Sequence, residues 1–123
     1  MSDRNLQNYP IQTKSNNHLI HKINKIYFMA TFIVRVQLDN GTMQDYTKLK
    51  NLLLHVGFTK KIINKEGFPY ILPLGNYLGE SDKDKFEVLT IVQRQVEKVR
   101  KRYQILVTES VRAGSAWAGL SQA

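Results

Sequence analysis

The residues best suited to chemistry on an anionic substrate lie between positions 43 and 56. Lys48, Asn51 and His55 recur at steps of three and four residues, which places them on one polar helix face, and Gln44 extends that face. Such a row could contact a phosphate backbone, although the solvated face of an amphipathic helix has the same pattern. Lys50 falls on the opposite flank, from which its side chain could reach toward a sheet edge.

Further cations follow along the chain. Lys60 and Lys61 are adjacent on an expected strand, so they point to opposite faces and serve either RNA contact or protection of a strand edge. Four cations close the second expected helix: Lys98, Arg100, Lys101 and Arg102. There they oppose the helix dipole, by about 0.3–1 kcal/mol each, and RNA contact is the alternative role.

Carboxylates and metal ligands are sparse. Asp39 and Asp45 flank the loop between the first strand and the first helix, where a phosphodiesterase could place a general base or a metal ligand. Turn formation and a favourable charge at a helix start are their commoner roles. The chain has no cysteine, and its three histidines lack the spacing of metal ligands. No metal or cofactor is therefore expected.

The elements that must position these residues alternate along the chain. A strand is expected over residues 31–38, an amphipathic helix over 43–56, a strand over 58–64, and a further extended stretch from Phe68 that Pro73 and Gly75 interrupt. Asp84 and Glu87 have the spacing of a capping box that starts a second helix, and a last strand covers 103–108. Pro73 places the interruption at an edge, at a bulge or between two short strands.

This order predicts an α+β fold of the ferredoxin-like type, β-α-β-β-α-β, with a four-stranded antiparallel sheet and two helices on one face. We expect one domain over residues 29–110. Residues 1–28 are expected to be a disordered or upstream leader, with Met29 the natural start, and residues 111–123 a flexible tail. The open sheet face or an edge strand would form a homodimer.

Charge favours an anionic partner. The 123 residues carry a net charge of +8, and the portion after residue 28 has fourteen basic against nine acidic residues, so the domain itself is basic. RNA, DNA and acidic proteins all fit this charge. No apolar run approaches the roughly 20 residues of a membrane span, and no signal peptide is evident. We therefore expect a cytoplasmic protein without a membrane partner.

Residues 57–72, preceded by the Lys-Leu-Lys-Asn-Leu segment at 48–52, resemble the GhoS family of type V antitoxins. The resemblance covers about residues 32–108 and implies a ferredoxin-like fold related to the CRISPR spacer-acquisition nucleases. It also implies an endoribonuclease that cleaves the messenger RNA of a small membrane toxin. Lys50 stands where that family has an arginine, and it lacks the planar fork of arginine. Gln37 stands where the family has an acid, with Asp39 two residues later as a substitute.

If the chain cleaves RNA, the expected catalytic residues are Lys50, at the position that the resemblance marks, Asp39 as the substitute acid, and His55. The 2′-hydroxyl would attack the adjacent phosphate while Lys50 offsets the developing charge and His55 or an acid moves protons. The expected RNA-binding residues are Lys48, Lys50, Asn51, Lys60, Lys61 and Arg100. The rival hypotheses are a non-catalytic RNA- or protein-binding module and a structural dimer with an acidic protein partner.

Tyr70, Tyr77 and Tyr103 could stack on bases if they lay on the open sheet face, and otherwise would be core or dimer contacts.

Overall fold

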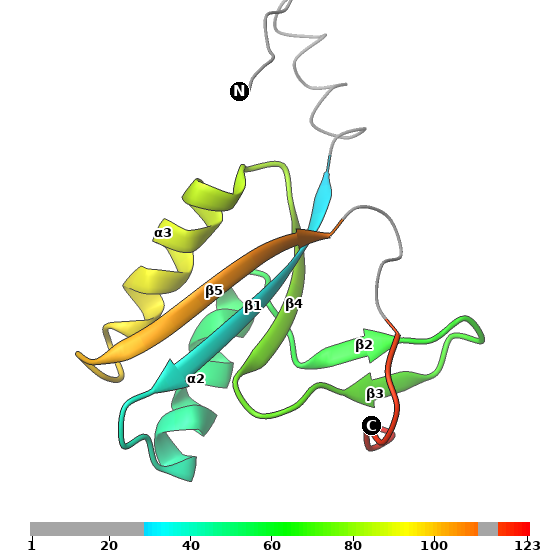
Figure 1. Ribbon diagram of the computed structural model, residues 1–123, viewed down its shortest axis with the longest axis horizontal. Helices are drawn as coiled ribbons and strands as arrows, with labels where there is room; N and C mark the ends of the chain where they lie inside the picture. Colours follow the sequence, from blue (N-terminus) through cyan, green and yellow to red (C-terminus); the bar gives the residue numbers. More distant parts are fainter. Residues whose placement is uncertain (1–28, 111–115) are drawn as a thin grey trace, which may run out of the picture.

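The computed structural model describes residues 29–110 and 116–123 of the chain, so the expected leader lies outside the described residues. Seven elements follow one another, with bounds β1 Ala30–Leu38, α2 Met43–His55, β2 Lys61–Ile63, β3 Pro69–Ile71, β4 Asn76–Ser81, α3 Lys85–Val96 and β5 Tyr103–Ser110. The fold is α+β, with two helices, a three-stranded antiparallel sheet and a separate two-stranded sheet (Figure 1).

The main sheet is built around β1, which lies between β4 and β5. Even-numbered residues of β1 are buried and form one core cluster with buried residues of both helices. The members contributed by β1 and the helices are Phe32, Val34, Val36, Leu38, Leu49, Leu53, Val88, Val92 and Val96. The helices therefore share one face of the sheet, and α2 lies behind the strands in Figure 1.

Both helices begin at capping boxes. Thr42 caps α2 and Asp84 caps α3, and in each helix the third residue returns a hydrogen bond to the cap backbone. The Asp84–Glu87 pair expected from the sequence is confirmed, and the Thr42–Asp45 pair has the same geometry. These reciprocal bonds satisfy backbone N–H groups that a helix start leaves without partners.

The expected four-stranded sheet is reduced to three strands and one bridge. Only Thr59 of the segment 58–64 pairs with β4, through two hydrogen bonds of 2.8 Å with Leu78. The next residue, Lys60, already accepts a bond from Leu72, and β2 then pairs with β3. Residues 73–77 thus have no backbone partner in the segment 58–64, and the hairpin arm is divided into β3 and β4. The β2–β3 pair therefore projects away from the main sheet (Figure 1).

Two features of residues 73–77 explain why the ladder breaks there. Pro73 has no N–H to donate to a ladder, and Gly75 has a positive φ of +78°. The Gly75 carbonyl accepts from the Val36 N–H at 2.7 Å, so the loop is held against β1. Of the alternatives open from the sequence, the division into two short strands is the one found.

The end of the expected tail lies beside β3. The Ile71 N–H donates to Ser121 at 2.8 Å, the Ala123 N–H donates to Pro69 at 3.0 Å, and Gln122 bridges to Tyr70. The ring of Trp117 lies 5.9 Å from that of Tyr70. Residues 121–123 therefore extend the β2–β3 pair by backbone pairing on the outer side of β3.

We expect Gly75→Ala to destabilise the protein far more than Gly67→Ala, because both glycines have positive φ but only a Cβ at Gly75 would collide with the Val36 carbonyl oxygen. The backbone conformation alone should cost about 1 kcal/mol at Gly67, and the collision should raise the cost to at least about 3 kcal/mol at Gly75. Urea denaturation measures both; equal losses would contradict this account of the loop.

Candidate functional site

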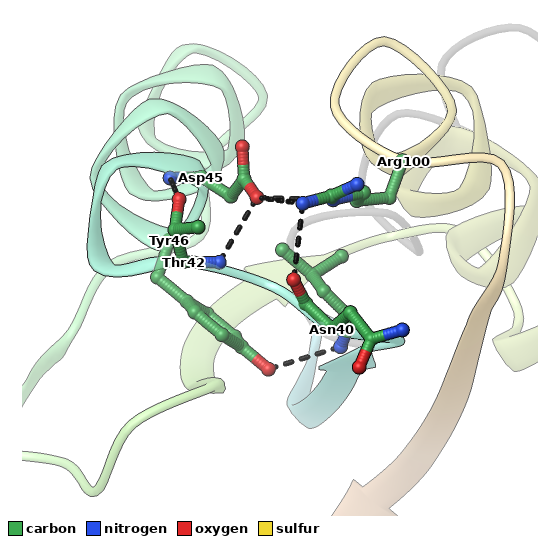
Figure 2. A network of polar contacts seen from close by, with 6 residues as sticks. Asn40, Thr42, Asp45, Tyr46 and Arg100 are labelled. Atoms are coloured by element: carbon green, nitrogen blue, oxygen red, sulfur yellow. Dashed lines mark hydrogen bonds and ion pairs between the residues drawn. The ribbon is translucent and has the colours of Figure 1, made fainter.

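The loop between β1 and α2 is tied to the end of α3 by Arg100. Its Nε donates to Asp45 Oδ2 at 3.0 Å, and its Nη2 donates to the Asn40 carbonyl at 3.0 Å and lies 2.9 Å from Asp45 Oδ2. Figure 2 shows this guanidinium between the carboxylate and the carbonyl. Arg100, which we predicted to bind RNA, therefore uses its guanidinium for contacts within the fold, and its side chain is 38% exposed.

Asp45 has a second set of contacts that fix its carboxylate. Its Oδ2 accepts from the Thr42 N–H at 3.0 Å, and the Asp45 N–H donates to Thr42 Oγ1 at 3.1 Å. The bond from the Thr42 backbone, helped by Arg100 and opposed by desolvation, holds the pKa of Asp45 below its ordinary value. Asp45 thus acts as a helix cap and ion-pair partner, which is the structural alternative to a catalytic acid.

Two side chains of the expected row on α2, those of Lys48 and His55, also contact the fold. Lys48 Nζ donates to the Lys98 carbonyl at 3.3 Å, beyond the end of α3. His55 Nδ1 lies 2.7 Å from the Asn51 carbonyl, a contact that requires this nitrogen to donate. Lys48, Asn51 and His55 are all exposed and share a face of α2, as the spacing predicted.

The proposed catalytic set is not gathered at one point. Asp39 precedes α2 and His55 is its last residue; α2 has 13 residues, so its ends lie about 18 Å apart at about 1.5 Å per residue. A single phosphodiester group cannot reach both side chains. Lys50 lies between them on the flank that faces away from Lys48.

Lys60 is the half-buried cation of the site. Its Nζ donates to the carbonyls of Pro73 at 2.6 Å and Asn76 at 3.2 Å, and it lies 5.0 Å from the centroid of the Tyr77 ring. Burial, and then the nearby charge of Lys50, lower the pKa of Lys60. Lys50 and Lys60 are thus the two predicted site residues whose charges the structure brings together. Lys61, one residue later, is exposed on β2.

The three tyrosines do not form a stacking platform. Tyr77 is 1% exposed in the core, and burial raises its pKa to about 12. Tyr103 packs against the same core, and its hydroxyl donates to Glu97 at 2.6 Å, which raises its pKa. Tyr70 lies on β3 beside Trp117. The core alternative is therefore the one found for Tyr77 and Tyr103.

The sequence did not single out a depression on the helix-free face of the main sheet. It has a volume of about 460 Å³, and its lining includes Arg35, Gln37, Leu74, Asn76, Gln104 and Leu106. The alternation of buried and exposed residues in β1 was the available signal, because it predicts that Arg35 and Gln37 share the face opposite the core. The partners from β4 and β5 could not be read from local pattern.

Within residues 29–110 and 116–123, no three His, Asp or Glu side chains form a group that could hold a metal ion. None of the helices in these ranges is long and apolar enough to cross a membrane. Models of known protein families and the sequences of curated proteins give no match to this chain.

We expect Asp45→Asn to weaken the pH dependence of stability at acid pH. A carboxyl group whose pKa is lower in the folded than in the unfolded chain stabilises the fold above the unfolded pKa, and this contribution is lost as the pH falls through the folded pKa. Urea denaturation of the wild type should show that the free energy of unfolding falls between about pH 5 and pH 2. The loss should be smaller in Asp45→Asn.

Asp39→Asn is the matched control, since the Asp39 side chain makes no hydrogen bond or ion pair to another residue in the described part of the chain. A loss of the same size in Asp45→Asn and the wild type would show that the contacts of the Asp45 carboxylate with Thr42 and Arg100 do not contribute to acid sensitivity.

Proposed function

We propose that this protein binds RNA through a basic surface centred on Lys50 and Lys60, named here the lysine pair. The observation that carries the proposal is that the charge of Lys50, on α2, acts on the half-buried Lys60, whose ammonium group donates to the carbonyls of Pro73 and Asn76. Within the described residues, Lys50 makes no hydrogen bond or ion pair of its own. Its ammonium is therefore free to meet an external anion.

An anionic partner would remove an electrostatic cost that the free protein carries. The partial burial of Lys60 disfavours its charged form, and the like charge of Lys50 adds to this cost. A phosphate group beside both ammonium groups would offset both costs. RNA offers such groups in series, and the net charge of +8 favours its approach at long range.

The biological role that we propose is that of a GhoS-like antitoxin acting on RNA in the cytoplasm. Its support is the resemblance at residues 48–52 and 57–72, together with two helices on one face of an antiparallel sheet in which β1 lies between β4 and β5. The Thr59–Leu78 bridge lies where the fourth strand of a ferredoxin-like fold would pair with β4. A homodimer is part of this proposal, because β5 pairs on one side only with the described strands.

RNA cleavage is the further step of this role, and Lys50 would contribute to it by stabilising charge on the phosphate. The 2′-hydroxyl would attack phosphorus, its proton would leave to a base, and the 5′-oxygen would depart with a proton. The separation of Asp39 from His55 supports at most one of them as a proton-transfer group for a phosphate at Lys50. Binding without turnover, the alternative, needs only the lysine pair.

We expect Lys50→Ala to weaken RNA binding uniformly across sequences and to reduce the slope of log affinity against log salt by about 0.7, the value for one phosphate contact on a single strand. Fluorescence anisotropy with labelled RNA at several salt concentrations measures both. Incubation with and without EDTA, followed on a gel, reports cleavage in the same samples.

Lys83→Ala is the matched control, because it removes the same charge at an exposed residue just beyond the far end of β4. Equal effects of the two substitutions would mean that net charge alone governs binding, and the lysine pair would not be the site. Cleavage that persists unchanged in Lys50→Ala would remove Lys50 from the mechanism.

A further inference from the structure

The face of the main sheet opposite the helices carries a continuous trough along β1 and β5. The larger depression is joined by a second one of about 340 Å³, which Gln37, Asp39, Arg102, Tyr103 and Gln104 line. Gln37 and Gln104 belong to both depressions, and they lie directly opposite each other on neighbouring strands. The two depressions are therefore parts of one surface, which we call the trough.

Strand register places a cation at the centre of the trough. Arg35 on β1 lies between Asn76 on β4 and Leu106 on β5. Arg35, Gln37 and Gln104 are all exposed, and none of their side chains forms a hydrogen bond or ion pair to the part of the chain that the structure describes. The larger depression has no carboxylate in its lining. An anion would thus meet an unneutralised guanidinium there.

Apolar surface flanks this cation on both sides. Leu106 and Leu74 are each 56% exposed, Leu106 on β5 and Leu74 in the loop that precedes β4. Large aliphatic side chains with this exposure lose unfavourable water contact when a flat apolar group covers them. The combination of an arginine, two carboxamides and two leucines matches the parts of a nucleotide, which are a phosphate, polar base edges and an apolar base face.

Charged residues lie at both ends of this face. Glu80 lies at one end, opposite Thr31, and Arg102 lies at the other end together with Asp39, whose N–H donates to the Arg102 carbonyl at 3.1 Å. Arg102 is four residues along the chain from Leu106, the partner of Arg35, which corresponds to about 13 Å in an extended strand. A chain with several phosphates fits two cations at this spacing better than one small anion does.

We propose that the trough binds a single-stranded segment of RNA, with bases covering Leu74 and Leu106 and with Arg35 at a phosphate or stacked on a base. The proposal rests on the RNA binding proposed above and extends it to the class of RNA. Single strands are favoured because their bases can be splayed out and stacked on arginine planes, and carboxamides can then bond to the exposed base edges. Duplex RNA keeps its bases stacked and paired, so it cannot offer base faces to Arg35, Leu74 and Leu106.

Residues 73–77 lie between the trough and the lysine pair. Leu74, Gly75 and Asn76 line the trough, while the Pro73 and Asn76 carbonyls accept from Lys60. One RNA strand that crosses this loop would therefore contact both surfaces. The trough supplies contacts with bases, and the lysine pair supplies contacts with the backbone.

The test compares Arg35→Gln with Arg94→Gln in the full chain, using fluorescence anisotropy with a random-sequence RNA about 12 nucleotides long, as a single strand and as a duplex. Arg94 is exposed near the end of α3, on the side of the sheet away from the trough. Arg94→Gln therefore removes the same charge at a site distant from the trough. We expect Arg35→Gln to weaken single-strand binding about tenfold and Arg94→Gln to leave it nearly unchanged. The wild type should prefer the single strand.

Chemical-shift mapping of the wild type with the same single strand gives a readout that does not depend on a variant folding. Shifts centred on Arg35, Gln37 and Gln104 support the proposal. Binding that depends on Lys50 but leaves these residues unshifted, with Arg35→Gln and Arg94→Gln equivalent, would overturn the trough and leave the lysine pair standing. Binding to neither RNA would overturn both proposals.

Discussion

The ammonium group of Lys60 holds the loop between β3 and β4 by donating to the carbonyl oxygens of Pro73 and Asn76. Carbonyls turned out of a ladder need donors, and a cation supplies stronger bonds than a neutral group does. With these groups satisfied, the hairpin arm can leave β4 after Thr59 and pair separately as β2 and β3. The shape of the sheet edge, the rim of the trough and the position of the lysine pair all follow from this arrangement.

The central strand β1 separates structural from functional roles by alternation. Its even-numbered residues fill the core under both helices, and its odd-numbered residues Arg35 and Gln37 form the floor of the trough. Because a strand presents successive side chains to opposite faces, core packing fixes the direction of the polar residues as well. The burial that stabilises the sheet therefore also holds the trough residues in register.

Local signals in the sequence predicted the helices and β1 well, whereas the sheet edge could not be predicted. Helix capping and the spacing of buried apolar residues involve neighbours only a few positions apart, so both can be recognised in a single sequence. The apolar residues in question are Leu49, Leu53, Val88, Val92 and Val96. The division of the hairpin depends on Lys60 reaching carbonyls thirteen and sixteen residues away. The interruption at Pro73 and Gly75 was expected from the sequence, but the departure of the segment 58–64 from β4 after Thr59 was not. The same limit applies to Arg100, whose partner Asp45 is 55 residues distant.

The cations of the chain divide into those that the fold uses and those that it leaves free. Arg100 and Lys48 join α2 to the end of α3, and Lys60 holds a loop, whereas Lys50 and Arg35 have no such task in the described residues. The sequence predicted RNA contact for Arg100, Lys48, Lys60 and Lys50, whereas it did not single out Arg35. The lysine pair couples the two groups, because an anion at Lys50 also eases the cost of keeping Lys60 charged and partly buried. A ligand that binds only the folded chain stabilises it, so a phosphate bound there would tighten the same loop that shapes the trough.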